Sequence, residues 1–198
     1  MWMAELTLAA GSRCSLKPHR RNQKSTSAKK QNVTAENSRP AGAEQRLTEL
    51  GITLPAPPEP FGVYAEAVQS GNLLFLTGML PTEGRRAKYV GRVGGELDVE
   101  AGRKAARRAA RNAVAVARQQ LGSLAKVMRI VRLGVYVATS GDVRGRPKVA
   151  DGASELLQDI FGKDKNPSRR AFGVASLPLG TPVELQVILR LGGSSEGR

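Results

Sequence analysis

The stretch Val99–Leu121, which reads VEAGRKAARRAARNAVAVARQQL, carries the clearest hydrophobic period in the chain. Apolar residues recur along it at spacings of three and four, and its basic residues form rows elsewhere on the helical cylinder. The pattern predicts a long amphipathic helix, with Asp98 suited as its N-cap and Gly122 as its stop. Because the apolar positions are mostly Ala and Val, this helix can lie close to a sheet. They are Ala106, Ala110, Ala113, Val114, Ala117 and Leu121.

Five segments around this helix have the composition of β-strands, and one more has the period of a helix. The turn Ser70-Gly71-Asn72 has hairpin length, and Val127–Ala138 is apolar at both parities, which is typical of a strand covered on two sides. The order β-β-α-β-α-β-β predicts an α+β fold, with a sheet and two helices packed on one of its faces. The expected strands are Tyr64–Gln69, Leu73–Thr77, Val127–Ala138, Arg170–Ser176 and Val183–Leu191, and the second helix is Val149–Phe161.

The opposite face of the predicted sheet also carries apolar residues. On the expected register these include Leu74, Val131, Val135 and Val187. An exposed apolar face of this kind predicts a partner, and the simplest partner is another copy of the chain.

The chain divides into a basic tail, one domain and a short C-terminal end. Residues 1–42 lack a hydrophobic period and are rich in polar and basic residues, so we expect a disordered tail. The tail is either a plain extension or, because its opening Met1–Ala10 is mildly apolar, a targeting segment. A short helix at Ala43–Leu50 and a proline-rich arm open the domain, which we place at residues 43–191, with 192–198 as a flexible C-terminus.

Composition excludes several classes of function. The single cysteine, Cys14, and the single histidine, His19, both lie in the tail, so the domain has no thiol or imidazole for catalysis or metal binding. We therefore expect no metal site. No apolar stretch reaches the roughly 20 residues that span a bilayer, so no membrane partner is expected. The lone cysteine fits a reducing compartment, either the cytoplasm or, if residues 1–40 act as a transit peptide, an organelle matrix.

Three groups of residues could carry chemistry in such a domain. Arg169 and Arg170 precede a strand, where a guanidinium is suited to recognise a carboxylate, but they could also be a solvated basic pair. Glu184 is an isolated acid in an apolar strand, where burial would raise its pKa and let it activate water. It could equally keep a strand edge soluble. Tyr64 could close an apolar pocket or pack in the core.

The stretches FGVYAEAVQSGNLLFLTGMLP at 61–81, PKVADGASELLQDIFG at 147–162 and RRAFGVASLPLGTPVE at 169–184 carry a family resemblance. They resemble the RidA/YjgF family, also called the L-PSP endoribonuclease family, and in particular its longer YjgF/chorismate-mutase-like branch. The resemblance implies a chorismate-mutase-like α+β fold assembled as a homotrimer with clefts between subunits. It also implies hydrolysis of reactive 2-iminoacids, which arise from enamines, to 2-oxoacids and ammonia without a metal or cofactor.

The resemblance implies roles for single residues as well. It places the arginine that clamps the substrate carboxylate at Arg169 and the glutamate that positions water at Glu184. Backbone groups near Ala171 would contact the imine nitrogen. The remaining substrate-binding positions are Tyr64, Thr77 and Gly78.

The sequence departs from the family pattern at several positions, and these departures bear on substrate range. Ala171 stands where many members have a cysteine, Met79 where they have a glutamine, and Val63 where they have a proline or asparagine. A family asparagine on the second helix has two possible counterparts here, Asp151 and Ser154.

Two alternative functions stay open. One is RNA binding or cleavage, which the endoribonuclease label suggests and the net charge of +14 permits, although only 4% of the residues are aromatic and could stack on bases. The other is a non-catalytic trimer that binds small ligands in its clefts.

Overall fold

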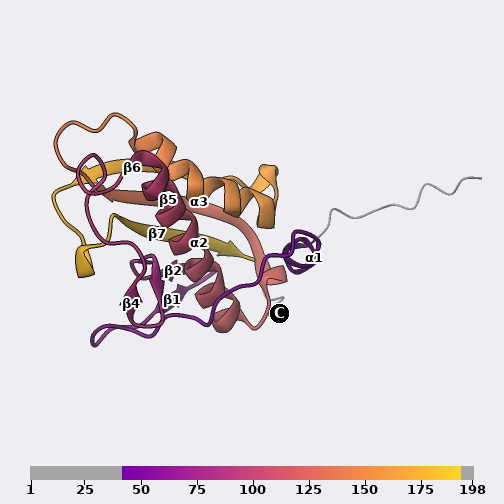
Figure 1. The fold of residues 1–198 in the computed structure, drawn as a ribbon. Helices are drawn as coiled ribbons and strands as arrows, with labels where there is room; N and C mark the ends of the chain where they lie inside the picture. The colour runs from indigo at the N-terminus through magenta and orange to yellow at the C-terminus, as the bar shows by residue number, and fades with distance from the viewer. Residues whose placement is uncertain (1–41, 193–198) are drawn as a thin grey trace, which may run out of the picture. The chain divides into compact units, whose positions relative to one another are not determined.

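The computed structural model describes residues 42–192 of the 198-residue chain. Apart from Gly42 and Gly192, the predicted tail and the predicted C-terminal end lie outside these residues. The α+β class is confirmed, because one layer is a five-stranded sheet and two helices, α2 (Val99–Leu121) and α3 (Arg146–Phe161), cover one of its faces (Figure 1). A third helix, α1 (Ala43–Glu49), precedes the sheet in the chain.

The sheet has the strand order β1-β2-β7-β5-β6. Neighbouring strands run antiparallel except β5 and β6, which are parallel and connected through α3. A parallel pair needs such a crossover because the chain must return to the same end of the sheet. β6 therefore forms one edge of the sheet, and β7 and β5 lie between it and the hairpin of β1 and β2. The strands are β1 (Ala67–Ser70), β2 (Leu73–Leu76), β5 (Val127–Ala138), β6 (Ser168–Val174) and β7 (Val183–Leu191).

Several boundaries differ from the prediction by two or three residues. β1 begins at Ala67 instead of Tyr64, because the chain before it bends and the Tyr64 N–H donates to the Gly62 carbonyl at 3.1 Å. α3 begins at Arg146, since a proline fits the first turn of a helix, where no N–H donor is needed. A small hairpin of β3 (Thr82–Glu83) and β4 (Arg86–Ala87) is not predicted, because strands of two residues show no hydrophobic period. Short 3-10 turns occupy Leu124–Lys126, Lys163–Lys165 and Pro178–Gly180.

Both predicted ends of α2 are confirmed. The Asp98 carboxylate accepts a hydrogen bond from the Ala101 N–H at 2.7 Å, which satisfies a donor that has no partner within the helix. Gly122 closes the helix with φ +74°, a left-handed conformation that glycine adopts without strain.

The predicted register of the sheet is wrong for three of four residues. Leu74, Val135 and Val187 are buried in the core beneath the helices, and only Val131 is exposed. A shift of one residue moves every side chain of a strand to the other face of the sheet. Because β5 has apolar residues at both odd and even positions, its sequence does not indicate which face is buried. The uncovered face carries apolar side chains nonetheless, although they are different ones. They include Val68 and Phe75, which face each other across β1 and β2, and Phe172, whose ring stacks on Tyr136 with centroids 5.7 Å apart.

Helices α2 and α3 approach each other closely because one contact position has no side chain. A Cβ atom at Gly152 of α3 would overlap the carbonyl oxygen of Arg103 in α2. The facing side of α2 is lined by buried alanines, which keep it close to the sheet as well. No helix among residues 42–192 combines the length and apolar character that a membrane span requires.

Replacing this glycine tests how tightly the helices are packed. We expect Gly152→Ala to lower the free energy of unfolding by about 1–3 kcal/mol, because the added methyl group meets backbone that must shift. The matched control is Glu155→Ala, which removes an exposed ion pair with Arg103 and should lower it by about 1 kcal/mol or less. Urea unfolding of both variants measures the difference. Equal losses would contradict the close packing at Gly152.

Candidate functional site

A small pocket lies beside the end of β2, between the proline-rich arm and the loop that follows Thr77. The arm is held down by Arg85, whose guanidinium lies 5.5 Å from the centre of the Phe61 ring and donates to the carbonyl of Pro60 at 3.3 Å. Three of the predicted substrate-binding positions, Tyr64, Thr77 and Gly78, line this one pocket. The structure thus brings Tyr64 together with two residues that lie 13 and 14 positions further along the sequence.

The tyrosine of the pocket has a fixed orientation. Its hydroxyl oxygen accepts a hydrogen bond from the backbone N–H of Phe61 at 2.9 Å, and its side chain is half exposed. Tyr64 is therefore not a core residue. Its position in the lining of the pocket agrees with the alternative interpretation as a pocket residue.

The opposite wall of the pocket depends on a buried residue that sequence reasoning missed. Asn112 of α2 donates from Nδ2 to the carbonyl of Leu80 at 2.8 Å and to the carbonyl of Thr82 at 3.1 Å. Buried polar groups need such partners, so Asn112 fixes this part of the loop. The sequence contains one signal for this role, which is a polar asparagine within the apolar Ala and Val face of α2. Backbone bonds between Met79 and Leu185, of 2.8 and 2.9 Å, tie the loop to β7.

Glu184 lies directly against this loop. Its carboxylate occupies the space that a side chain at Gly78 would fill, because a Cβ there would overlap Oε1. It is half-buried and has neither an ion pair nor a hydrogen bond among residues 42–192. Burial raises the pKa of the Glu184 carboxyl above its ordinary value, because the charged form loses hydration. Such a carboxylate can hold a water molecule and accept its proton closer to neutral pH.

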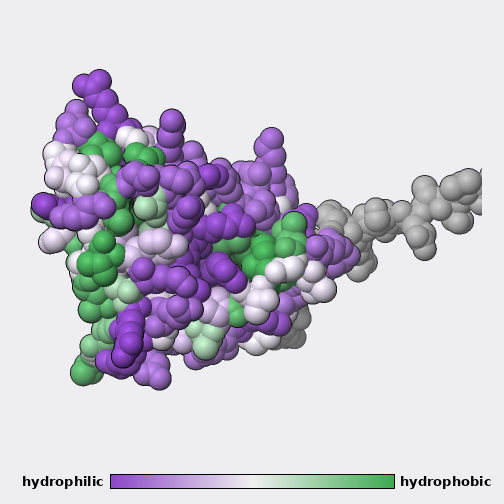
Figure 2. Space-filling view, in the orientation of Figure 1, coloured by the Kyte–Doolittle hydropathy of each residue, from purple (hydrophilic) through white to green (hydrophobic). Residues whose placement is uncertain are grey.

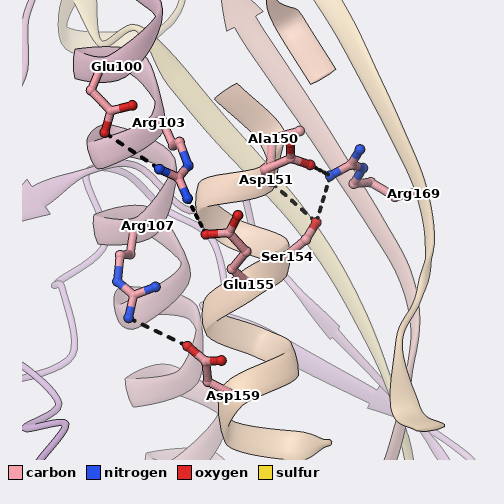
Figure 3. Close-up of polar contacts among 9 residues, drawn as sticks. All are labelled: Glu100, Arg103, Arg107, Ala150, Asp151, Ser154, Glu155, Asp159 and Arg169. Atoms are coloured by element: carbon pink, nitrogen blue, oxygen red, sulfur yellow. Dashed lines mark hydrogen bonds and ion pairs between the residues drawn. The ribbon is translucent and has the colours of Figure 1, made fainter. Parts of the chain in front are cut away.

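Arg169 lies on β6 and points toward α3 (Figure 3). Its Nη1 donates to Oδ1 of Asp151 at 2.6 Å and to Oγ of Ser154 at 3.0 Å. The Ser154 hydroxyl in turn donates to the carbonyl of Ala150 at 3.3 Å. The structure therefore brings both candidate counterparts of the family asparagine to the same arginine. Nε and Nη2 of Arg169 form no hydrogen bond within residues 42–192 and remain available to a ligand.

Ion pairs between α2 and α3 position the helix that carries Asp151. Arg103 pairs with Glu155, and Arg107 lies 3.7 Å from the Asp159 carboxylate, one helical turn further along (Figure 3). These pairs are half exposed, so each contributes little to stability. Together they join successive turns of α2 to successive turns of α3 and so align the two helices.

The second arginine and the alanine after it have different surroundings. Arg170 is opposite Gly134 in the β5–β6 register, so it lies on the uncovered face of the sheet. Ala171 is opposite Val135, faces the helices and packs against the core.

A single chain does not bring Arg169 and Glu184 together. Arg169 is in register with the buried Leu133, on the helix side of the sheet, whereas Glu184 is in register with Tyr136, on the uncovered side. The strand β5 also separates their strands. The candidate residues therefore form two clusters, one around Glu184 and Tyr64 and one around Arg169.

Comparison with known proteins decides the family. Residues 44–189 match the family described as "YjgF/chorismate mutase-like, putative endoribonuclease". The chain belongs to this family. Protein TCP17 of Trypanosoma cruzi is 38% identical to the YjgF-family chain over 146 residues, which are 73% of the chain and 91% of TCP17. A protein named 2-iminobutanoate/2-iminopropanoate deaminase, from Dermatophagoides farinae, is 30% identical over 138 residues, which are 70% of the chain and 93% of that protein.

Solved structures of two other proteins show the same fold. A protein of unknown function from Agrobacterium tumefaciens has a TM-score of 0.69 and 35% identity, and covers 76% of this chain and 92% of its own. A "putative endoribonuclease" from Shewanella oneidensis has a TM-score of 0.73 and 30% identity, and covers 76% of this chain and 100% of its own. The family resemblance expected from the sequence is confirmed. No group of three or more potential metal ligands occurs within residues 42–192.

The raised pKa of Glu184 predicts a stability difference that depends on pH. Above the ordinary glutamate pKa of 4.5 the unfolded chain gains more from ionisation than the folded chain, so Glu184 lowers stability as the pH rises. We expect Glu184→Gln to be more stable than the wild type at pH 7, with the difference vanishing below pH 4.5. Thermal unfolding of both proteins at pH 4 and pH 7 measures it.

Glu96 supplies a control of opposite sign. A hydrogen bond from the Arg92 backbone N–H is the largest cause that lowers the pKa of Glu96, so its charged form stabilises the fold. Glu96→Gln should therefore be less stable than the wild type at pH 7. A Glu184→Gln effect that is independent of pH would show that the carboxyl group is not desolvated.

Proposed function

We propose that this YjgF-family protein hydrolyses reactive 2-iminoacids, R–C(=NH)–COO⁻, with one water molecule to the 2-oxoacid R–CO–COO⁻ and ammonia. The observation that carries the proposal is the unpaired, half-buried carboxylate of Glu184 against Gly78, a residue that lines the Tyr64 pocket. The name of the Dermatophagoides farinae relative supports the same reaction.

In the proposed reaction, Glu184 acts on water. Its carboxylate accepts a hydrogen bond from the water, whose oxygen attacks the imine carbon while the C=N bond becomes a single bond. The proton that the water loses passes through the carboxylate to the nitrogen, which gives a carbinolamine. The carboxylate then carries the remaining hydroxyl proton to the same nitrogen, and the C–N bond breaks as the C=O bond forms, so that ammonia and the 2-oxoacid are released. The raised pKa of Glu184 suits this role, because a group that takes and returns a proton works best near the pH of its surroundings.

Arg169 would bind the substrate carboxylate. Asp151 and Ser154 both bond to Nη1, and this leaves the Nε and Nη2 donors side by side, the geometry that a carboxylate accepts through both oxygens. Asp151 and Ser154 are then positioning residues, because they act on the substrate through the arginine. Ala171, two positions further along β6, would present its backbone to the imine nitrogen.

The two clusters would meet across subunits. Because Arg169 and Glu184 lie on opposite sides of the sheet within one chain, we propose that the β6 edge of one copy faces the Tyr64 pocket of the next. Contact through the uncovered sheet face would also cover its exposed apolar side chains, Val68, Phe75 and Phe172. A homotrimer would provide three such sites.

A second arginine gives a matched test of the carboxylate clamp. We expect Arg169→Ala to lower kcat/KM for freshly generated 2-iminopropanoate by about 10²-fold, because two charge-assisted hydrogen bonds to the substrate are lost. Arg144→Ala removes the same charge from an exposed loop and should keep kcat/KM within about twofold of wild type, because it leaves this cluster intact. Ammonia release is the readout, with circular dichroism to verify folding. Equal losses in both variants, or no acceleration by the wild type, would contradict the proposal.

Mixing two inactive variants tests whether the site spans two copies. Arg169→Ala and Glu184→Gln are unfolded together in equal amounts and refolded, so that mixed oligomers form. If each site takes its arginine from one copy and its glutamate from the next, about a quarter of the sites become intact, and activity rises accordingly. If both residues act within one chain, the mixture is no more active than its two components. The variants refolded separately are the control.

Cleavage of RNA is the second candidate, favoured by the family description and by the net charge of +14. The unpaired Glu184 carboxylate favours the deaminase, because it repels phosphate while it suits a neutral imine carbon.

A further inference from the structure

A basic groove lies along α2, and one of its residues, Arg108, donates to the carbonyl of Thr82, which also lines the Tyr64 pocket. Four cations from two successive turns of α2 meet Lys88 and Tyr89 from the segment after β4, and they enclose about 230 Å³. Figure 2 shows hydrophilic residues gathered over α2. The four α2 residues are Lys104, Arg107, Arg108 and Arg111.

The charges in this groove are only partly balanced. Glu83 lies 3.1 Å from Lys88 and 3.6 Å from Arg108, and its pKa is lowered first by the hydrogen bond from Lys88. Asp159 lies 3.7 Å from Arg107. Two carboxylates thus face five cations. Lys104 and Arg111 have no carboxylate partner within residues 42–192.

Burial makes this imbalance significant. The Arg108 side chain is only 14% exposed, and its Nε donates to the Thr82 carbonyl at 3.0 Å. Arg111 donates to the Thr53 carbonyl, but its Nε is buried and has no acceptor. A buried donor without a partner is rare in folded proteins and costs free energy, and like charges one turn apart on a helix repel each other. An anion in the groove would relieve the repulsion.

We propose that this groove binds an anion with two or three consecutive phosphate groups. Such an anion carries enough negative charge to balance the excess cations, and its oxygens suit both the planar arginine donors and the lysine ammonium groups. The cations from Lys104 to Arg111 lie within about 10 Å along the helix axis, so they form a compact site. A nucleic-acid strand would need a longer track of cations and several aromatic residues, whereas Tyr89 is the single aromatic in the groove.

Calorimetric titration of the protein with sodium tripolyphosphate tests the site. The buffer contains EDTA, and sodium chloride keeps the ionic strength constant. We expect saturable binding of one tripolyphosphate per chain, and a Kd at least about tenfold higher for the double variant Lys104→Gln/Arg111→Gln, because two charged donors are lost. The double variant Arg144→Gln/Lys163→Gln removes the same net charge from exposed positions outside the groove. Its Kd should stay within about twofold of wild type, since distant surface charges are screened.

A second titration, with ATP, identifies the source of the phosphates. Equal Kd values for ATP and tripolyphosphate support a site for the phosphate chain alone, and tighter binding of ATP supports a nucleoside triphosphate, with Tyr89 beside the base. The proposal is overturned if neither anion saturates, if both double variants weaken binding equally, or if a single-stranded RNA oligonucleotide binds more tightly than tripolyphosphate at the same salt concentration. These readouts do not involve deamination, so they are independent of the proposed function.

Discussion

The close contact between α2 and α3 is the constraint on which the rest of the structure depends. It exists because Gly152 lets the two backbones meet and because buried alanines let α2 lie flat on the sheet. The position of α3 then determines where Asp151 and Ser154 stand, and through them the direction in which Arg169 points. The direction of Arg169, the proposed substrate contact on an edge strand, is thus set by packing between the two helices. The exposed ion pairs between the helices serve alignment more than stability.

The Glu184 cluster rests on a different support. Asn112 fixes the loop after β2 from the same helix, and backbone bonds fix it from β7, so the loop cannot move away from the glutamate. The Glu184 carboxylate lies against Gly78 of this loop, and its partial burial raises its pKa. A partly buried charged group such as Glu184 lowers the free energy of unfolding. Such a loss of stability is typical of functional sites.

The sequence predicts most of the fold and only part of the site. The length, caps and buried face of α2 follow from its period and from Asp98 and Gly122, because local rules set them. The face assignment of Leu74 and Val135 fails because their strands are apolar at both parities, so register depends on pairing with β7. Val187 is different, because polar residues alternate with apolar ones in β7 and this alternation indicates that Val187 faces the core. Tyr64, Thr77 and Gly78 share a pocket as the family resemblance implies. The role of Asn112 in fixing the loop and the separation of Arg169 from Glu184 both depend on tertiary contacts. The spacing of residues in the sequence does not predict either of them.

The two sides of α2 tolerate amino-acid substitution to different degrees. On the inner side nearly every position is a small residue in contact with the sheet or α3, so there is little volume to alter without loss of packing. On the outer side the basic residues differ: Lys104 is exposed, whereas Arg108 and Arg111 donate hydrogen bonds to the backbone carbonyls of Thr82 and Thr53. A change of charge at Lys104 over evolutionary time therefore has little effect on folding, whereas a change at Arg108 or Arg111 removes a hydrogen bond that joins α2 to the neighbouring loops.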